Sequence, residues 1–432
     1  MYKLKRKTRL GDQQFETIIP GGAHTYSRGN DQFALNAPSS LTRGKGYVVW
    51  DTSGRRYIDL SMGLRSVSIG HGKLSQSLRV FSASSRGLNL SRPTPDEYFL
   101  AEKIQSLVPA AEMVKFGKNG SDANNGAIRL ARASTGRKYV LRCSDTSFLS
   151  VADWFIGSTP MASGALNSTA QYTKNFAYGD PASLIDAFNS TSGDVAAVIM
   201  EPYGLNGLNE KFLEMVRGFC TENGIVLILD EIVSGFRWNK GGLHQFTNVR
   251  PDLVTFGKGI ANGFPLSVLA GSAELMDLGG IRHKGERVFL MSSTFGPERV
   301  SIAAADWTLT KLTDSSIQKT KQVAHEFKEI LNGALSTAGL AGEAELQGTD
   351  LLPYMSFSGK FDDDIPRAKA CFNYAAMEHG VIMPYFSFSS SHRERFLGEF
   401  ANVAEGVSKL FIELWETKAQ VGSIKPVFRS YN

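Results

Sequence analysis

The middle of the chain alternates short apolar runs with an amphipathic helical pattern, and this alternation limits the fold most strongly. Three runs are typical of buried strands: Val195–Met200 (VAAVIM), residues 225–229 (IVLIL) and Leu253–Phe256 (LVTF). Apolar residues recur at helical spacing over residues 210–223, and Gly224 follows as a helix C-cap. A strand, a helix and a strand at this spacing predict a parallel α/β sheet.

The two ends of the chain carry different patterns. Residues 46–60 (GYVVWDTSGRRYIDL) predict a hairpin, and from about Asp314 onward long helices alternate with short strands. A chain of 432 residues is also too long for one compact core. We therefore expect a large α/β domain over residues 66–310 and a smaller α+β lobe built from residues 1–65 and 311–432.

Composition argues against several classes of protein. Hydrophobic residues make up 42% and charged residues 21%, as in soluble globular proteins, and a net charge of +5 gives no reason to expect nucleic-acid binding. No apolar run is long enough for a membrane span, and no secretory signal follows the basic first residues (MYKLKRKTRL). The three cysteines, Cys143, Cys220 and Cys371, form no CxxC pair, which favours a reducing cytoplasm over a zinc or disulfide framework.

Three features carry candidate chemistry. Asp230 ends an apolar strand (LILDE), at the rim where α/β sheets bind ligands. Lys258 closes the next strand between two glycines, and a desolvated lysine in such a loop can form a Schiff base. Residues 119–122 (NGSD) begin a helix, whose N-terminus can bind phosphate. Each feature alone is also explained by an ion-paired Asp, a surface Lys or a capped helix without a ligand.

Pyridoxal 5′-phosphate (PLP) requires all three features together. Its phosphate needs an anion site, its aldehyde condenses with a lysine, and its pyridine nitrogen must stay protonated so that the ring can accept an electron pair from the substrate. A buried carboxylate beside that nitrogen favours the protonated form. The combination therefore predicts a PLP enzyme with Lys258 and Asp230 at its centre.

At these residues the chain resembles the class III (ω) aminotransferases of fold type I, and among them the glutamate-1-semialdehyde aminomutase-like group. The resemblance extends over residues 19–406. The motifs that carry it are IPGGAHTYSRG, GYVVWDTSGRRYIDL, GHG, EMVKFGKNGSDANNGAIRLARASTGR, AAVIMEP, LILDEIVSGFR, PDLVTFGKGIANGFP and SSTFG.

The resemblance implies roles around the cofactor ring. Lys258 matches the Schiff-base lysine, which also moves a proton, and Asp230 matches the partner of the ring nitrogen. Ile232 matches the aliphatic residue on one ring face. Thr294 matches a threonine that reaches the phosphate of the neighbouring subunit, which implies a homodimer.

The resemblance also implies contacts with the phosphate and with the substrate. Asn119, Gly120 and Ser121 match the phosphate cup, and Glu201 and Asn206 match positions near the ring's 3-oxygen. Three arginines match substrate-facing positions: Arg28, Arg65 and Arg92. Arg28 aligns with an arginine that binds the substrate carboxylate, a task that suits a guanidinium group. For Arg65 and Arg92 a structural ion pair is an equally ordinary explanation.

Two segments depart from the family pattern. The family usually has an aromatic–His–Gly run after the strand that ends at Cys143, where this chain has SDTSFLSVADW and Phe148 could replace the aromatic. The C-terminal FSFSSSHRERF lacks the acidic stretch common in the family. Both departures favour another amino or keto substrate, such as a sugar or a secondary metabolite, over the aminomutase reaction of tetrapyrrole synthesis.

The sequence leaves the reaction open between an aminotransferase and an intramolecular aminomutase. A non-catalytic PLP-binding protein is a further alternative, against which the joint presence of Lys258, Asp230 and the phosphate cup argues. Residues 150–168 are a candidate mobile loop, although an ordinary surface loop explains them as well. Patterns for P-loop nucleotide binding, HExxH metal sites and GxSxG hydrolases are absent from the sequence.

Overall fold

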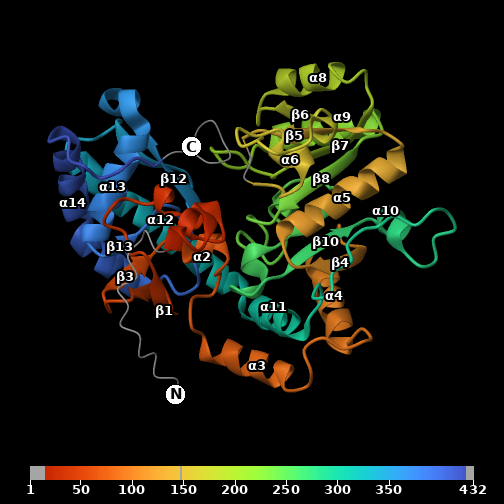
Figure 1. Cartoon of the computed structure of the whole chain (residues 1–432), viewed down its shortest axis with the longest axis horizontal. Helices are drawn as coiled ribbons and strands as arrows, with labels where there is room; N and C mark the ends of the chain where they lie inside the picture. Colours follow the sequence, from red (N-terminus) through yellow and green to blue (C-terminus); the bar gives the residue numbers. More distant parts are fainter. Residues whose placement is uncertain (1–14, 146–147, 425–432) are drawn as a thin grey trace.

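The computed structural model describes residues 15–145 and 148–424, which form two lobes side by side (Figure 1). The large lobe contains a seven-stranded sheet. The small lobe combines the first strands of the chain with its C-terminal third, coloured red and blue in Figure 1. The first and the last described segments of the chain therefore belong to one lobe.

The large sheet is mostly parallel. Its strands lie in the order β4 (Met113–Gly117), β10 (Ser267–Gly271), β9 (Leu253–Phe256), β8 (Val226–Glu231), β7 (Val195–Met200), β5 (Tyr139–Cys143) and β6 (Thr173–Phe176). Only β10 runs antiparallel to its neighbours β4 and β9. The strands β7, β8 and β9 are fully buried, which is why they read as continuous apolar runs in the sequence.

Helices cover both faces of this sheet. On one face lies α5 (Gly120–Thr135), whose Ala127, Ile128 and Leu130 pack against Ile199 and Ile228 of the sheet, with α6 (Asp153–Ile156) and α10 (Ala273–Met276) beside it. The opposite face carries α4 (Pro95–Leu107), α8 (Pro181–Asn189), α9 (Glu210–Glu222) and α11 (Arg299–Lys311). Helix α3 (Leu74–Ser84) packs on the outside of α11.

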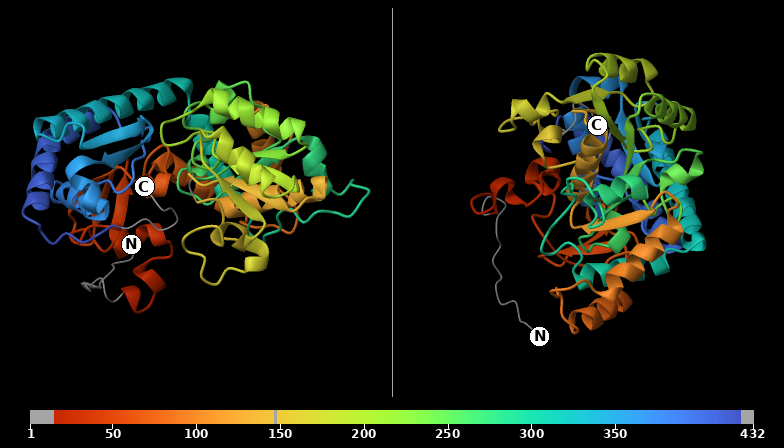
Figure 2. Two further views of the ribbon diagram at one scale, coloured as in Figure 1. Left: turned by 90° about the horizontal axis from the view of Figure 1, so that it is seen from above. Right: turned by 90° about the vertical axis from the view of Figure 1, so that its right-hand side faces the viewer.

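The small lobe has its own aromatic core. Its four-stranded sheet has the order β1 (Leu41–Lys45), β2 (Val48–Asp51), β3 (Arg56–Asp59) and β13 (Val381–Ile382), and β13 pairs in parallel with β3 from the other end of the chain. A hairpin follows, β11 (Ala344–Thr349) with β12 (Leu352–Phe357). The helices are α12 (Asp314–Thr337), which runs along the outside of the lobe (Figure 2), α13 (Ile365–Glu378) and α14 (Glu394–Glu416).

Short helical turns complete the described chain. They are η1 (Pro20–Gly22), η2 (Tyr26–Arg28), η3 (Asn30–Gln32), α2 (Met62–Arg65), α7 (Asn167–Ala170), η4 (Leu243–Phe246), η5 (Lys258–Ala261), η6 (Asp277–Gly279) and η7 (Gly359–Asp364). Within the ranges that the structure describes, no helix is long and apolar enough to cross a membrane, and no group of three or more His, Cys, Asp or Glu side chains is placed to hold a metal ion.

The predicted α/β class is confirmed, with one shift at the site. The strand expected at residues 225–229 extends to Glu231, so that Asp230 lies within β8 and not after it. The core of the large sheet takes its residues from Ile69 to Leu312, and the core of the small lobe from Ile58, Leu60 and residues 323–421. This division supports the domain boundaries at residues 65 and 310, which remain a prediction.

Candidate active site

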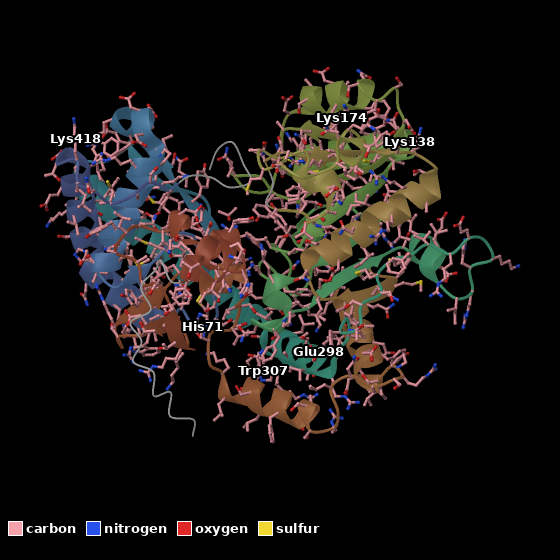
Figure 3. The ribbon with its side chains drawn as sticks, viewed as in Figure 1. His71, Lys138, Lys174, Glu298, Trp307 and Lys418 are labelled. Carbon is pink, nitrogen blue, oxygen red and sulfur yellow. The ribbon has the colours of Figure 1, made fainter. Side chains whose placement is uncertain are left out.

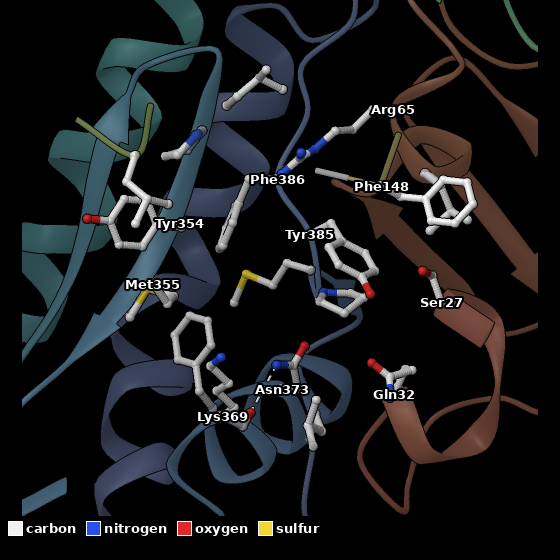
Figure 4. Close-up of a pocket in the computed structure, with 18 of the residues that line it drawn as sticks. Ser27, Gln32, Arg65, Phe148, Tyr354, Met355, Lys369, Asn373, Tyr385 and Phe386 are labelled. Atoms are coloured by element: carbon white, nitrogen blue, oxygen red, sulfur yellow. Dashed lines mark hydrogen bonds between the residues drawn. The ribbon is translucent and has the colours of Figure 1, made fainter. Parts of the chain in front are cut away.

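A cavity of about 280 Å³ lies between the lobes, at the carboxyl ends of the parallel strands. Lys138 and Lys174, near the amino ends of β5 and β6, lie on the side of the large lobe away from it (Figure 3). The large lobe contributes Lys258 and Glu201 to its wall. The small lobe contributes residues of β12, of α13 and of the segment 383–386, among them Tyr354, Asn373 and Tyr385 (Figure 4). The cavity therefore occupies the place where α/β sheets bind ligands.

Lys258 is held on a tight turn between β9 and β10. Its φ of 43° is left-handed, a conformation that non-glycine residues seldom adopt and that active sites retain when the surroundings fix it. The turn is tied to the segment before α3, because Ser68 Oγ donates to the Gly259 carbonyl at 2.6 Å and the Ile69 N–H donates to Asn262 Oδ1 at 2.8 Å. Desolvation, with help from the Arg65 charge, lowers the pKa of the Lys258 amine to about 8.

The charge of Asp230 interacts with those of Lys258 and Glu201. Its side chain is buried; its Oδ2 accepts from Asn124 Nδ2 at 2.7 Å and its Oδ1 from the Ile232 N–H at 2.8 Å. Burial, reinforced by Glu201, raises the pKa of Asp230 to about 7, while the two hydrogen bonds and the Lys258 charge act in the opposite direction. Because Asp230 and Glu201 also raise the pKa of Lys258, the three groups share one site at the rim of the sheet.

The N-terminus of α5 lies against Ile232, two residues after Asp230. Asn119 is the N-cap residue, and Asp122 Oδ2 accepts from the N–H groups of Lys118 and Asn119, both at 2.9 Å. A Cβ on Gly120 would lie 2.4 Å from Ile232 Cδ1, so glycine lets the helix end approach the isoleucine closely. The first N–H groups of a helix have no acceptor within the helix and favour an anion.

These features fit the chemistry of PLP. The helix end at Gly120 and Ser121 could hold a phosphate, and Ile232 packs between that end and Gly257, the residue before the lysine. Asp230 carries an ionisable acceptor beside Lys258, which supplies an amine with a lowered pKa. The donors, the acceptor and the amine are those that the phosphate, the ring nitrogen and the aldehyde require.

Arg65 reaches the cavity from a strained turn. The φ angles from Met62 to Arg65 are 43°, 61°, 58° and 70°, four successive left-handed residues that cost about 1–2 kcal/mol each when they are not glycine. Asp59 Oδ1 holds the turn by accepting from the N–H groups of Ser61 and Met62, at 2.9 and 3.1 Å. Arg65 lines the cavity, and among the described residues its buried Nε has no hydrogen-bond partner.

Nine of the twelve predicted site residues are not among the described residues that line the cavity. Asn119, Gly120, Ser121, Asp230 and Ile232 belong to the start of α5 and the end of β8 described above, whereas Arg28, Arg92, Asn206 and Thr294 are exposed in other segments. Arg28 follows Ser27, which does line the cavity, and Asn206 follows the lining residue Leu205. Their roles remain predictions, whereas Lys258, Glu201 and Arg65 are brought together by the fold.

The structure adds residues that the sequence did not single out. Asn124 lies three positions after Ser121, hence on the same face of α5, and that spacing was the available signal. Its partner Thr255 is the neighbour of Asp230 across β8 and β9, and two strands do not reveal their register in the sequence. Tyr203 also lines the cavity.

The segment after Cys143, which departs from the family pattern, contributes to the cavity. Phe148 lines the cavity and packs edge-on against Phe155 with ring centroids 5.2 Å apart. Ser150, Trp154 and Phe155 are buried, and Trp154 Nε1 donates to Asn125 Oδ1 at 2.8 Å. The first part of the candidate mobile loop that begins at residue 150 is therefore packed into the large lobe.

Comparison with known proteins identifies the family. The family model "Aminotransferase class-III" matches residues 29–383. The glutamate-1-semialdehyde 2,1-aminomutase of Anaeromyxobacter sp. strain K is 28% identical over 408 residues, which cover 89% of this chain and 93% of that protein.

Solved structures agree in fold. The PLP internal aldimine form of the FumI protein of Sphingopyxis sp. MTA144 is 26% identical with a TM-score of 0.84, covering 96% of this chain and 97% of that one. A glutamate-1-semialdehyde aminomutase of Pseudomonas aeruginosa PAO1 is 19% identical with a TM-score of 0.79, covering 93% of each chain. The chain belongs to the class III aminotransferases, PLP-dependent enzymes of fold type I.

Proposed function

We propose that this protein is an aminotransferase that moves an amino group from an amine donor to a keto or aldehyde acceptor. The observation that carries the proposal is the interaction between the charges of Lys258, which lines the cavity, and Asp230, which is buried at the end of β8. PLP, when bound, supplies the electron sink that stabilises charge at the substrate carbon.

Separate residues are assigned to proton transfer, to the cofactor ring and to its phosphate. Lys258, with a pKa near 8, can be neutral near physiological pH and can therefore take up and return a proton at the reacting carbon. Asp230 would keep the ring nitrogen of bound PLP protonated, and Ile232 would pack on one face of the ring. The phosphate is assigned to Asn119, Gly120 and Ser121 at the start of α5.

The substrate carboxylate is assigned to Arg65. This guanidinium lines the cavity and influences the pKa of Lys258, so an anion bound to it would lie near the reacting amine. Its unpartnered Nε leaves a donor for a ligand. A guanidinium suits a carboxylate because it can donate two parallel hydrogen bonds. Arg28 and Arg92 would need a change of position, or a second subunit, to compete for this role.

We further propose that the protein is a cytoplasmic homodimer. Leu74, Leu78 and Phe81 lie on one face of α3 and are exposed by 72%, 60% and 71%, which defines the α3 apolar face. The segment that follows α3 lies against the loop of Thr294, because the Asn89 side chain donates to the Thr294 carbonyl at 2.8 Å. Exposed apolar faces of this kind commonly bind a second subunit. Thr294 would then reach the phosphate site of the neighbouring subunit.

The aminomutase reaction is the second candidate, because curated relatives with that name match along 89% of the chain. The aromatic wall around Tyr385 and Phe386 and the departing segments favour an aminotransferase acting on another substrate.

The two reactions differ in what they produce without an acceptor. We would mix the PLP-loaded protein with single amine donors and quantify products by mass spectrometry. An aminotransferase releases about one keto product per site and stops, whereas an aminomutase converts glutamate 1-semialdehyde completely. A protein that binds PLP but releases no product from any donor would be a binding module, and the proposal would be wrong.

A further inference from the structure

A buried chain of hydrogen bonds ends on the Asp230 carboxylate. Thr255 Oγ1 donates to Asn124 Oδ1 at 2.8 Å, and Asn124 Nδ2 donates to Asp230 Oδ2 at 2.7 Å. Thr255 and Asn124 are completely buried, and Asp230 is 2% exposed. These side-chain hydrogen bonds add to the backbone pairing of the sheet, in which Asp230 and Thr255 already face each other across β8 and β9.

The partners of the Asn124 amide determine which group donates at each step of this hydrogen-bond chain. Asn124 Nδ2 also donates to the Leu149 carbonyl at 2.8 Å, so its two amide hydrogens meet two acceptors. If the amide were turned over, its oxygen would face the Leu149 carbonyl and the Asp230 carboxylate, and three acceptors would meet without a proton. The Thr255 hydroxyl therefore donates to Asn124, and Asn124 donates to Asp230.

These donors oppose the effect of burial on Asp230. Burial and the Glu201 charge favour the protonated acid, whereas the donors Asn124 Nδ2 and Ile232 N–H favour the carboxylate. A protonated Asp230 could not keep a pyridine nitrogen charged. A donor polarised by its own hydrogen bond is a stronger donor, so Thr255 acts on Asp230 through Asn124.

We propose that Asn124, supported by Thr255, is a positioning residue that keeps Asp230 ionised and directed at the ring nitrogen of PLP. This inference rests on the proposed function, because it assigns the nitrogen of the ring to Asp230. It goes further in making the strength of the electron sink depend on two completely buried residues, one in α5 and one in β9.

A purely structural role makes a different prediction. A buried polar chain that only ties α5 to the sheet would affect the stability of the fold and leave the protonation of the bound cofactor unchanged. The test must therefore measure the ring nitrogen itself. PLP labelled with ¹⁵N at the pyridine position reports its protonation by NMR in the loaded protein.

The decisive variants are Thr255→Val and Thr255→Ser. Valine has nearly the shape of threonine but no hydroxyl, whereas serine keeps the donor. We expect Thr255→Val to lower the pH at which the ring nitrogen loses its proton, by about one unit or a tenfold change in the equilibrium, and to lower kcat with KM little changed. Thr255→Ser should restore the titration of the wild-type protein.

A matched control is Thr308→Val in α11. Thr308 is equally buried, and its Oγ1 donates to the Ala304 carbonyl at 2.7 Å within α11, the helix on the opposite face of the sheet from α5. It should change thermal stability without moving the nitrogen titration. An unchanged titration in both Thr255→Val and Asn124→Leu, with PLP still bound, would overturn the inference and leave the proposed function standing. A wild-type protein that binds no PLP would overturn the proposed function itself.

Discussion

Ile232 occupies the space that a side chain on Gly120 would need, since a Cβ at that position would lie 2.4 Å from Ile232 Cδ1. The same isoleucine lies 3.2 Å from the position of a Cβ on Gly257. One aliphatic side chain thus separates the proposed phosphate site from the lysine turn, and two glycines let the backbone close around it. The distance between these two sites is therefore set by the volume of Ile232.

Gly120→Ala should weaken PLP binding. The added methyl group must displace Ile232 or the start of α5, and overpacking of this kind costs about 1–3 kcal/mol. We expect roughly a ten- to hundred-fold rise in the dissociation constant of PLP, measured by titrating the cofactor-free protein. Gly333→Ala in α12 is the control, because outside the surrounding turns of α12 no described residue has an atom within 4 Å of the added methyl group, and alanine favours a helix. Unchanged affinity in Gly120→Ala would show that the helix end does not hold the phosphate.

The attachment of PLP to the cofactor-free protein should depend on pH with a midpoint near 8. The pKa of Lys258 is lowered to about 8, and only the neutral amine attacks an aldehyde. Raising the pH toward 8 increases the neutral fraction about tenfold per unit, and above 8 the fraction is already near its limit. Stopped-flow absorbance should therefore show a rate constant that rises and then levels off above pH 8. A rate that still rises up to pH 10 would mean that Lys258 titrates like an ordinary lysine.

Arg65→Gln should raise KM for donors that carry a carboxylate. Loss of a charge-assisted pair costs about 1.5–3 kcal/mol, or roughly a ten- to hundred-fold rise in KM. Donors without a carboxylate should be little affected, so the ratio of the two donor types is the measurement. Arg395→Gln, a change at an exposed arginine of α14, is the control. Equal losses with both donor types would assign Arg65 to the structure of its turn and not to the substrate.

Leu78→Glu should shift the protein toward monomers in sedimentation. A charge in the centre of the α3 apolar face would be buried without a partner if two copies meet there, and such a group is costly. The monomer should also bind PLP less tightly, because the proposed phosphate contact of Thr294 comes from the second copy. Lys418→Gln, on the opposite lobe, changes the net charge by the same single unit and is the control (Figure 3). A wild-type protein that sediments as a monomer would remove the dimer proposal.

The sequence predicted the parts of the site that depend on local pattern. Buried strands of a parallel sheet are continuous apolar runs, so the positions of Lys258 and Asp230 at the rim followed from where those runs stop. The N-terminus of α5 was recognisable because Gly120 precedes a helical face. These features need no knowledge of distant parts of the chain.

Other parts depend on contacts that no short segment encodes. Thr255 lies beside Asp230 only because β8 and β9 pair in one register, and Asn124 joins them only because α5 crosses those strands. The left-handed turn that carries Arg65 is maintained by Asp59 and by Arg237, which donates to the Arg65 carbonyl from another segment. The roles predicted for Arg28 and Thr294 would depend on contacts outside the cavity of one subunit, since neither residue is among its described lining.

The separation of the chain into two cores has a consequence for how substrate preference can evolve. The lysine, the carboxylates and the helix end all belong to the large lobe, while β12, α13 and residues 383–386 form the facing wall on a different core. Mutations in that wall can change which molecule fits without loosening the packing that supports the reactive groups. Natural selection can thus act on the large lobe to preserve the reaction and on the small lobe to change the preferred substrate.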